Sequence, residues 1–434
     1  MTGVQTCALP IFNSGNPATG LNPQATFDSD WVTQTGGVFF YSLIATGSGN
    51  FIISNFGQDS SFAGNKTAQG NADGRGIGDF YYEPPTGFLA LCTQNLPEPT
   101  VVPSEHFNTV LYTGDAGNLA QSITGVGFQP DLLWIKSRVT GYGHALQDVV
   151  RGATSRLQSN TTGAEATSAT YVTSFDTDGF SVSTDYGQNA PNEPYASWNW
   201  KANGAGVSNT NGTITSTVSA NVDAGFSIVS YTGTGVVATV GHGLSSAPEL
   251  IHVKERNSTS GWITYNKTIL ATKYLSLSST MAAAANTSVW NNTTPTSTVF
   301  SLGTNLATNE SARPIIAYCF HSVEGYSKVG SYTGNGSADG TFVHCGFRPA
   351  YVMVKGSSVA GSSWIVIDST RDSYNVASQY LHPNLSNAEG STPLLDFTSN
   401  GFKWRYSGAS GNTSGGTYIF LAFAENPFKY TNAR

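Results

Sequence analysis

A unit that recurs three times along the chain constrains its fold more than any other feature. In each copy a Tyr-Thr-Gly triplet is followed by glycine, then by proline, and then by an apolar run that ends in lysine. The tyrosine and the lysine are separated by 24, 23 and 23 residues in the three copies. The motif residues are Tyr112, Gly127, Phe128, Pro130 and Lys136 in copy one, Tyr231, Gly243, Pro248 and Lys254 in copy two, and Tyr332, Gly346, Phe347, Pro349 and Lys355 in copy three.

A unit copied in series favours a structural or binding role. An active site is normally built once, whereas serial copies extend a molecule or multiply a surface. We therefore predict that the chain is not an enzyme.

The composition fits a chain of several small β domains. The length of 434 residues favours three or four domains. Hydrophobic residues make up 39%, which is enough for packed cores, while charged residues make up only 11%. Abundant small polar residues with spaced aromatic residues are typical of short strands joined by tight turns.

The second half of each copy also recurs, as short aromatic and β-branched runs bounded by glycine or asparagine, which indicate strands. The last such run of each copy is apolar at nearly every position, which is typical of a strand buried on both faces. Only 279–285 suggests a helix. The sequence thus predicts an all-β fold of tandem β-sandwich domains, jelly-roll or lectin-like, in series.

The predicted boundaries follow from changes in composition. Residues 12–99 form a first segment with strands at 38–44, 51–56, 80–82 and 87–92, followed by a proline-rich linker at 100–104. Repeat 1 covers 105–203, repeat 2 covers 222–323 and repeat 3 covers 324–430. The stretch 204–221 is either a linker or an edge strand.

Charge and spacing exclude several classes of function. The net charge is −7 and there is no run of basic residues, so nucleic-acid binding is not expected. No apolar stretch is long enough for a membrane-spanning helix. The four cysteines are scattered, and we expect buried free thiols. No metal or cofactor is expected, because the histidines lack ligand spacing and the acidic residues of 71–79 do not match a calcium loop.

One pair of charged residues recurs in two copies. Asp148 precedes Arg151 as Asp368 precedes Arg371, but copy two has Asn266 and Ile269 at these positions. Such a pair can clamp a turn, or the aspartate can be a catalytic carboxylate. We favour the clamp, because copy two has lost both charges and no second acid recurs.

The motif lysines and three aromatic residues carry further expectations. We expect Lys136, Lys254 and Lys355 to be surface residues whose aliphatic stems lie along the strand ends. Tyr186, Trp290 and Tyr406 are candidates for stacking on sugar rings. The alternative is that these three aromatic residues cap the sandwich edges, and the sequence does not separate the two.

Two resemblances concern the N-terminal part. Asn55-Phe56-Gly57-Gln58 and Pro84–Cys92 resemble the C-terminal half of a SPRY-type sandwich, over about residues 30–95. Residues 1–11 resemble a translated sequencing-adapter peptide from metagenomic reading frames. We therefore expect 1–11 to be non-native and the natural N-terminus to be missing.

The repeats, through the motif elements above and the closing Ala424–Lys429 segment, resemble an uncharacterised domain of structural proteins from marine tailed bacteriophages. The resemblance implies a virion component such as a tail fibre, a tail spike or another exposed appendage. Its implied partners are other virion proteins and host-surface glycans, and by analogy with fibres a homotrimer fits. A secreted bacterial adhesin of the same build and a glycan-degrading enzyme are the alternatives.

Overall fold

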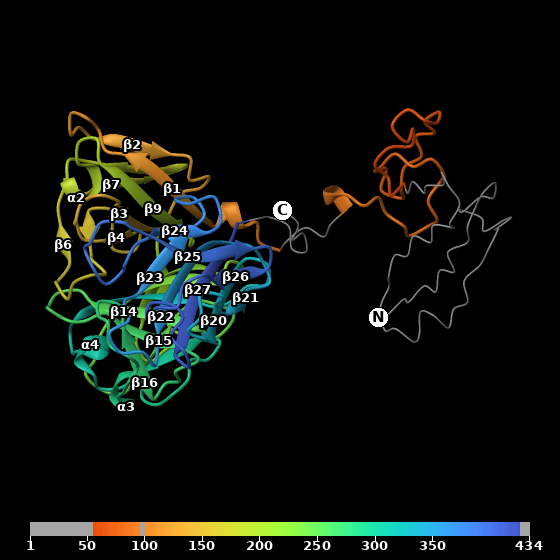
Figure 1. The fold of residues 1–434 in the computed structure, drawn as a ribbon. Helices are drawn as coiled ribbons and strands as arrows, with labels where there is room; N and C mark the ends of the chain where they lie inside the picture. The colour runs from red at the N-terminus through yellow and green to blue at the C-terminus, as the bar shows by residue number, and fades with distance from the viewer. Residues whose placement is uncertain (1–54, 96–99, 426–434) are drawn as a thin grey trace. The chain divides into compact units, whose positions relative to one another are not determined.

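The structure, a computed structural model, describes residues 55–95 and 100–425 (Figure 1). The chain divides into two compact units, Met1–Pro97 and Glu98–Arg434. The expectations for residues 1–11 and for strands at 38–44 and 51–54 lie outside the described residues.

Residues 55–95 are a succession of turns. They contain the 3-10 helix η1 (Thr93–Asn95) and one isolated bridge between Asn71 and Phe80. The predicted strands at 80–82 and 87–92 are therefore wrong. The cause is that side chains bind backbone groups that a β-ladder would use, because the Asp73 carboxylate accepts hydrogen bonds from several backbone N–H groups, including that of Ala90.

Repeat 1 is a sandwich of two antiparallel sheets. The sheet that faces the other two repeats, called the inner sheet, has the order β1-β9-β3-β4. The sheet on the far side of the sandwich, called the outer sheet, has the order β2-β8-β7. The elements of repeat 1 are η2 (Pro103–Glu105), β1 (Phe107–Thr113), β2 (Gln121–Thr124), β3 (Leu132–Ser137), β4 (Ala145–Asp148), β5 (Ser155–Arg156), β6 (Ala166–Thr167), β7 (Val172–Asp176), β8 (Gly179–Val182), α2 (Tyr186–Asn189) and β9 (Pro194–Trp200).

Repeat 2 has the same plan with an added hairpin. The inner sheet has the order β10-β11-β12-β19-β14-β15-β16-β17 and the outer pair is β13-β18. The elements are β10 (Val207–Asn209), β11 (Ser216–Asn221), β12 (Phe226–Thr232), β13 (Ala238–Gly241), β14 (Leu250–Glu255), β15 (Ile263–Asn266), β16 (Lys273–Ser276), β17 (Ala284–Ala285), α3 (Thr287–Trp290), β18 (Val299–Leu302), α4 (Leu306–Asn309) and β19 (Pro314–Phe320). Strands β10 and β11 come from the stretch 204–221, which therefore belongs to the repeat 2 sheet, with β10 at its edge.

Repeat 3 closes the described part of the chain. Its inner sheet has the order β20-β27-β22-β23 and its outer sheet the order β21-β26-β25-β24. The strands are β20 (Ser327–Thr333), β21 (Phe342–His344), β22 (Pro349–Gly356), β23 (Ile365–Asp368), β24 (Ala377–Tyr380), β25 (Gly390–Thr398), β26 (Gly401–Trp404) and β27 (Thr417–Ala424).

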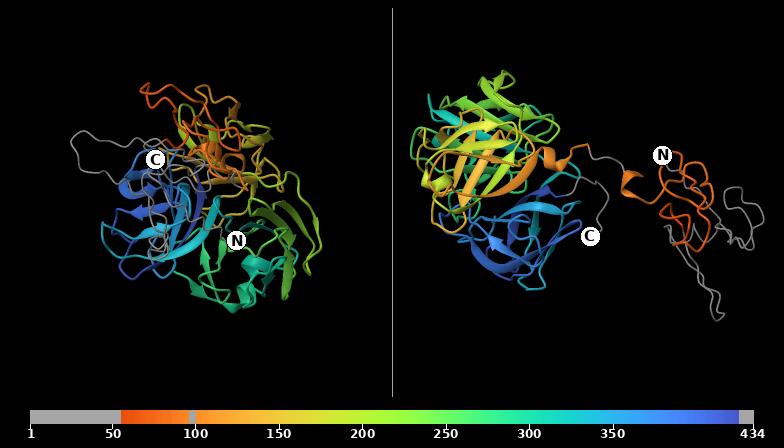
Figure 2. Two further views of the ribbon diagram at one scale, coloured as in Figure 1. Left: turned by 90° about the vertical axis from the view of Figure 1, so that its right-hand side faces the viewer. Right: turned by 90° about the horizontal axis from the view of Figure 1, so that it is seen from above.

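The three inner sheets share one hydrophobic core. One face of each inner sheet packs against its own outer sheet, and the other face packs against the inner sheets of the other two repeats. The shared core contains Trp198 and Trp200 from repeat 1, Tyr318 and Phe320 from repeat 2, and Phe423 from repeat 3. Figure 2 shows the three repeats grouped around this centre.

The all-β prediction is confirmed, but the expectation of sandwiches following one another in a line is corrected. The reason lies in β9, β19 and β27, which are buried on both faces. Aromatic side chains on the inner face would be exposed on a separate two-layer sandwich, and each such side chain has roughly 150–250 Å² of surface to bury. The repeats therefore close into a ring.

The predicted helix at 279–285 is also wrong. This stretch is extended, and Ala284–Ala285 form β17. The Ala283 N–H donates to the Ser357 carbonyl of repeat 3 at 2.8 Å. A contact between repeats therefore overrides the helix propensity of alanine.

Candidate functional site

The Asp–Arg pairs form as predicted. The Arg151 Nε lies 2.6 Å from Asp148 Oδ2, and the Arg151 N–H donates to Asp148 Oδ1 at 2.9 Å. Arg371 makes the same two contacts with Asp368, at 2.6 and 2.8 Å. All four side chains are fully buried, so each pair is an internal clamp.

Each clamp lies at a boundary between repeats, which we call a seam. In the 1/2 seam the Tyr318 hydroxyl of repeat 2 donates to Asp148 at 2.7 Å. Glu165 then joins Arg151, at 2.9 Å, to Arg256 of repeat 2, at 2.7 Å. Burial alone would raise the pKa of Glu165, but the hydrogen bond from Arg256 and the charge of Arg151 lower it overall.

The 3/1 seam repeats this arrangement. The indole N–H of Trp198, in repeat 1, donates to Asp368 at 3.0 Å. Glu389 joins Arg371, at 2.9 Å, to Arg138 of repeat 1, at 2.7 Å. Each charged seam thus holds two acids and two arginines, and its formal charges cancel.

The 2/3 seam is neutral. The backbone hydrogen bond from Ala283 to Ser357 matches those from Glu165 to Arg256 and from Glu389 to Arg138, both at 2.7 Å. These contacts and the strand registers identify the equivalent residues. The five polar residues of the 1/2 seam are Asp148, Arg151, Glu165, Arg256 and Tyr318. At the equivalent positions, in the same order, the neutral seam has Asn266, Ile269, Ala283, Ser357 and Leu421.

One further hydrogen bond crosses each seam, and in each repeat it comes from the residue directly before β4, β15 or β23. Trp262 donates to the Gln158 carbonyl at 2.9 Å, and Trp364 donates to the Ser276 carbonyl at 2.8 Å. His144 holds this position in repeat 1, and its Nε2 lies 2.9 Å from the His382 carbonyl oxygen. Repeat 2 thereby contacts repeat 1, repeat 3 contacts repeat 2, and repeat 1 contacts repeat 3.

The motif lysines are buried, which corrects the expectation of surface residues. Lys136, Lys254 and Lys355 are fully inaccessible. Each Nζ donates to the carbonyl of the next residue and to one in the loop after its strand, for example Lys355 to Ser362 at 2.8 Å. Burial lowers the pKa of each lysine to about 8. The lysines hold loops, because a protonated amine satisfies carbonyls that have no strand partner.

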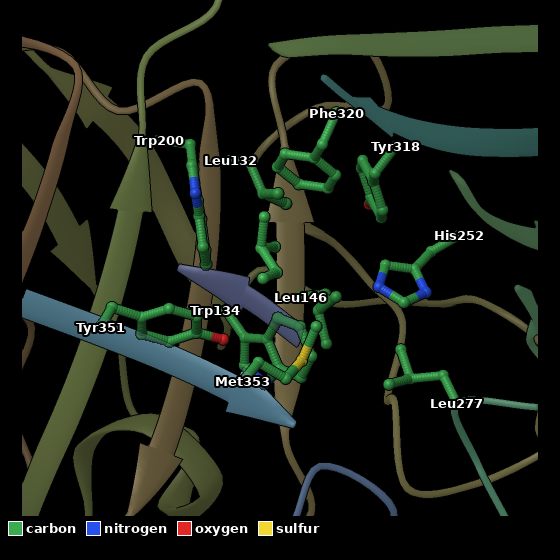
Figure 3. A pocket seen from close by; sticks show the side chains of 11 residues that line it. Leu132, Trp134, Leu146, Trp200, His252, Leu277, Tyr318, Phe320, Tyr351 and Met353 are labelled. Atoms are coloured by element: carbon green, nitrogen blue, oxygen red, sulfur yellow. The ribbon is translucent and has the colours of Figure 1, made fainter. Parts of the chain in front are cut away.

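The centre of the ring contains a very small cavity. Figure 3 shows aromatic and aliphatic side chains from all three repeats around it, among them Trp200, His252 and Tyr351. Its volume is about 10 Å³. A single water molecule needs roughly that space, so the cavity is too small for a substrate.

The Tyr-Thr-Gly motif builds the outer end of each repeat, which we call the lobe tip. The tip comprises the loop after the motif and the segment before the last inner strand, which includes α2 or α4 in repeats 1 and 2. Tyr112 donates to the Gln188 carbonyl at 2.7 Å, and Tyr231 and Tyr332 make the matching bond at the same length. A side chain on Gly114 would place its Cβ 2.0 Å from the Ala190 carbonyl oxygen, so only glycine fits there.

A buried asparagine at each tip escaped the sequence analysis. Asn189, Asn309 and Asn412 are inaccessible, and each holds the loop after the motif through its amide. The signal was present, because each asparagine lies five residues before the last strand of its repeat.

Replacing Gly114 with alanine tests this tip geometry. The overlap with Ala190 is expected to lower the free energy of unfolding by about 1–3 kcal/mol, the usual cost of overpacking. Chemical denaturation measures the effect. Gly163→Ala is the control, because its Cβ would meet no atom closer than 3.4 Å. Equal stabilities of the two variants would contradict the proposed tip contact.

The structure separates the three aromatic candidates. Tyr186 opens α2 and is 53% exposed, so its ring is available. Trp290 is buried against Tyr265 and cannot stack on an external sugar, which corrects that candidate. Tyr406 is half-buried against the repeat 3 core. The exposed Leu306 in α4 matches Tyr186, and periodicity did not indicate it.

His242 and the cysteines of repeats 2 and 3 are buried. His242 lies between the Thr296 carbonyl and the Leu244 N–H. Cys319 and Cys345 are buried free thiols, as predicted, whereas the free thiol Cys92 is only partly buried. Within the described ranges, no cluster of three or more potential ligands could hold a metal ion, and no helix is long and apolar enough to cross a membrane.

The fold and its seams define a closed, three-lobed all-β domain with one shared core. The chain belongs to the family described as Domain of unknown function (DUF7483), whose model matches residues 102–427 as a single stretch. This match covers all three repeats, in agreement with their shared core. No curated protein matches the chain.

Proposed function

We propose that this chain is a structural protein of a tailed-phage particle, placed in an exposed appendage, whose lobe tips bind host-surface glycans. The phage assignment depends on the resemblance carried by the repeated Tyr-Thr-Gly and Gly-Phe-x-Pro elements. Other virion proteins are its expected partners, and the virion is its expected location.

The binding part of this proposal is supported by which recurring positions are buried and which are exposed. The recurring lysines, Asp–Arg pairs and asparagines are all buried in structural contacts. Two tips nevertheless expose apolar side chains at matching positions. These are Leu119 and Tyr186 in repeat 1, at 66% and 53% exposure, and Val236 and Leu306 in repeat 2, at 62% and 65%.

Exposed apolar groups at a loop tip suit a weak, shallow contact. A tyrosine ring can cover the C–H face of a sugar, while nearby amides and carboxylates bind its hydroxyls. Such sites gain strength through avidity when several tips or several copies engage one surface.

Burial of Asp148 and Asp368 supports this proposal over a glycan-degrading enzyme, because a catalytic acid must reach its substrate. A secreted bacterial adhesin could use the same tips. Phage packaging and portal genes beside the coding sequence would favour the phage assignment over the adhesin.

A glycan array with the full chain tests the binding. Tyr186→Ala is expected to reduce retention of the bound glycans at least several-fold, because it removes the exposed aromatic ring of the repeat 1 tip. Tyr374→Ala is the matched control, since Tyr374 is 83% exposed but lies away from the tips. If the unaltered chain retains no glycan, or if both variants bind equally, the glycan-binding role is wrong.

A further inference from the structure

Repeat 3 has an open groove at the edge of its sandwich. The groove lies between β20 and β21, the edge strands of the inner and outer sheets, and has a volume of about 390 Å³. Gly330, Phe342 and Phe420 line it together with Lys267, Lys328 and His344. Phe342 is 45% exposed there.

The equivalent position in repeat 2 is filled by the chain itself. Residues 213–221 run between β12 and β13, where β11 pairs with β12 through Thr217 opposite Ser230 and Val218 opposite Val229. The Ile214 N–H donates to the Thr239 carbonyl at 3.0 Å, and the Ser216 hydroxyl donates to Gly241 at 2.9 Å. The inserted strand therefore joins both sheets.

The inserted strand shows which sequence suits such a groove. Ile214, Ser216 and Val218 are buried, whereas Thr213, Thr215 and Thr217 are exposed. This alternation is that of a strand with one face on a core and one face in water.

Repeat 3 lacks a corresponding insertion. Only the short stretch 321–326 separates β19 from β20, whereas 201–225 separates β9 from β12. The Val329 N–H points away from β27 and binds the Ser322 hydroxyl at 2.9 Å. Backbone direction alternates along a strand, so the N–H groups of Ser331 and Thr333 also point away from β27, toward the open edge.

The groove differs from its filled counterpart in charge. Lys328 stands where repeat 2 has Ser227, and His344 where repeat 2 has Gly241. No carboxylate is among the residues that line the groove, although Lys267 pairs with Glu249 at its margin. Gly330 has no side chain, and the Phe420 ring covers it, 2.6 Å from where a Cβ would lie.

We propose that this groove binds an extended, acidic strand of a partner protein by β-strand addition to β20. The inserted strand of repeat 2 provides the geometry, and Lys328 selects for a carboxylate. A second copy of this chain matches less well, because the acidic residues of its edge strands are already engaged. Asp148 in β4 and Asp368 in β23 are buried in the clamps, and Asp176 in β7 accepts a hydrogen bond from the Ser181 hydroxyl.

The inserted strand supplies a probe for this site. The peptide Asn211–Val218 ends opposite Gly330, before the part of β20 that Ser322 and Val323 already cover. A second peptide carries Val218→Glu, which places a carboxylate opposite Gly330 and diagonal to Lys328. Binding of both peptides to the full chain is measured by calorimetry at low and at moderate salt.

The glutamate peptide is expected to bind several-fold more tightly than the unaltered one at low salt, and added salt should shrink the difference. Lys328→Ser, which restores the residue of repeat 2, should remove this preference. Ser331→Pro should weaken both peptides at least tenfold by removing an edge N–H, and Ser331→Ala should leave binding unchanged. Circular dichroism of each variant verifies its fold.

Three results would overturn the proposal. The first is no binding of either peptide at millimolar concentration. The second is equal binding by the unaltered chain and a folded Ser331→Pro variant. The third is a dimer of the unaltered chain that Ser331→Pro abolishes, because the groove would then serve a second copy.

Discussion

Arg151→Ile is expected to lower the free energy of unfolding by about 3–5 kcal/mol, the usual cost of removing one partner of a buried ion pair. Asp148 and Glu165 would stay buried without their shared cation. Isoleucine is the residue that the neutral 2/3 seam has at this position. Denaturation in urea, with the midpoint and the slope both recorded, measures the change.

The chain supplies the compensating variant. Asp148→Asn, Arg151→Ile, Glu165→Ala, Arg256→Ser and Tyr318→Leu together convert the 1/2 seam into the composition of the 2/3 seam. This combined variant is expected to regain most of the stability lost by Arg151→Ile, because no unpaired charge remains buried. A combined variant no more stable than the single one would contradict the equivalence of the seams.

The seams show how far the sequence could predict this site. The recurrence of Asp148 and Arg151 as Asp368 and Arg371 was enough to predict a clamp. Their long-range partners were not predictable, because Tyr318 and Trp198 belong to other repeats and lie about 170 residues away. The ring arrangement shows that Asn266 and Leu421 face each other across one seam. Asn266 replaces the buried aspartate of the other seams, and Leu421 replaces the side chain that donates a hydrogen bond to it.

The same limit explains the errors in the fold. Within the three repeats, local patterns predicted the strands correctly, since periodicity and turn residues act over a few positions. The apolar runs at 195–200, 315–320 and 418–423 correctly predicted strands buried on both faces. These runs did not reveal that the second face of each strand packs against another repeat. The sequence pattern of a lysine at a strand end is also the same whether its amine contacts water or backbone carbonyls. Burial of Lys136, Lys254 and Lys355 follows from loop closure over their amines.

Lowering the pH from 7 to 5 is expected to destabilise the domain by several kcal/mol. Burial lowers the pKa of His252 to about 3 and that of His242 to about 4, and it holds the pKa of His144 well below 6.5. Below pH 6.5 the unfolded chain therefore binds protons that the folded chain does not, and stability falls with pH. Each unit of pH costs about 1.4 kcal/mol per histidine, or roughly 2 kcal/mol each for His252 and His242 at pH 5.

His252→Met isolates one of these groups, because Met353 holds the equivalent position in repeat 3. The loss of unfolding free energy between pH 7 and pH 5 is expected to shrink by about 2 kcal/mol in this variant, whatever its stability at pH 7. Urea denaturation at pH 7, 6 and 5 gives the comparison. His344→Gln is the control, since His344 is exposed. An unaltered chain with equal stability at pH 7 and pH 5 would mean that His252 and His242 accept protons in the folded core. The aromatic centre would then be more open to water than its cavity of about 10 Å³ allows.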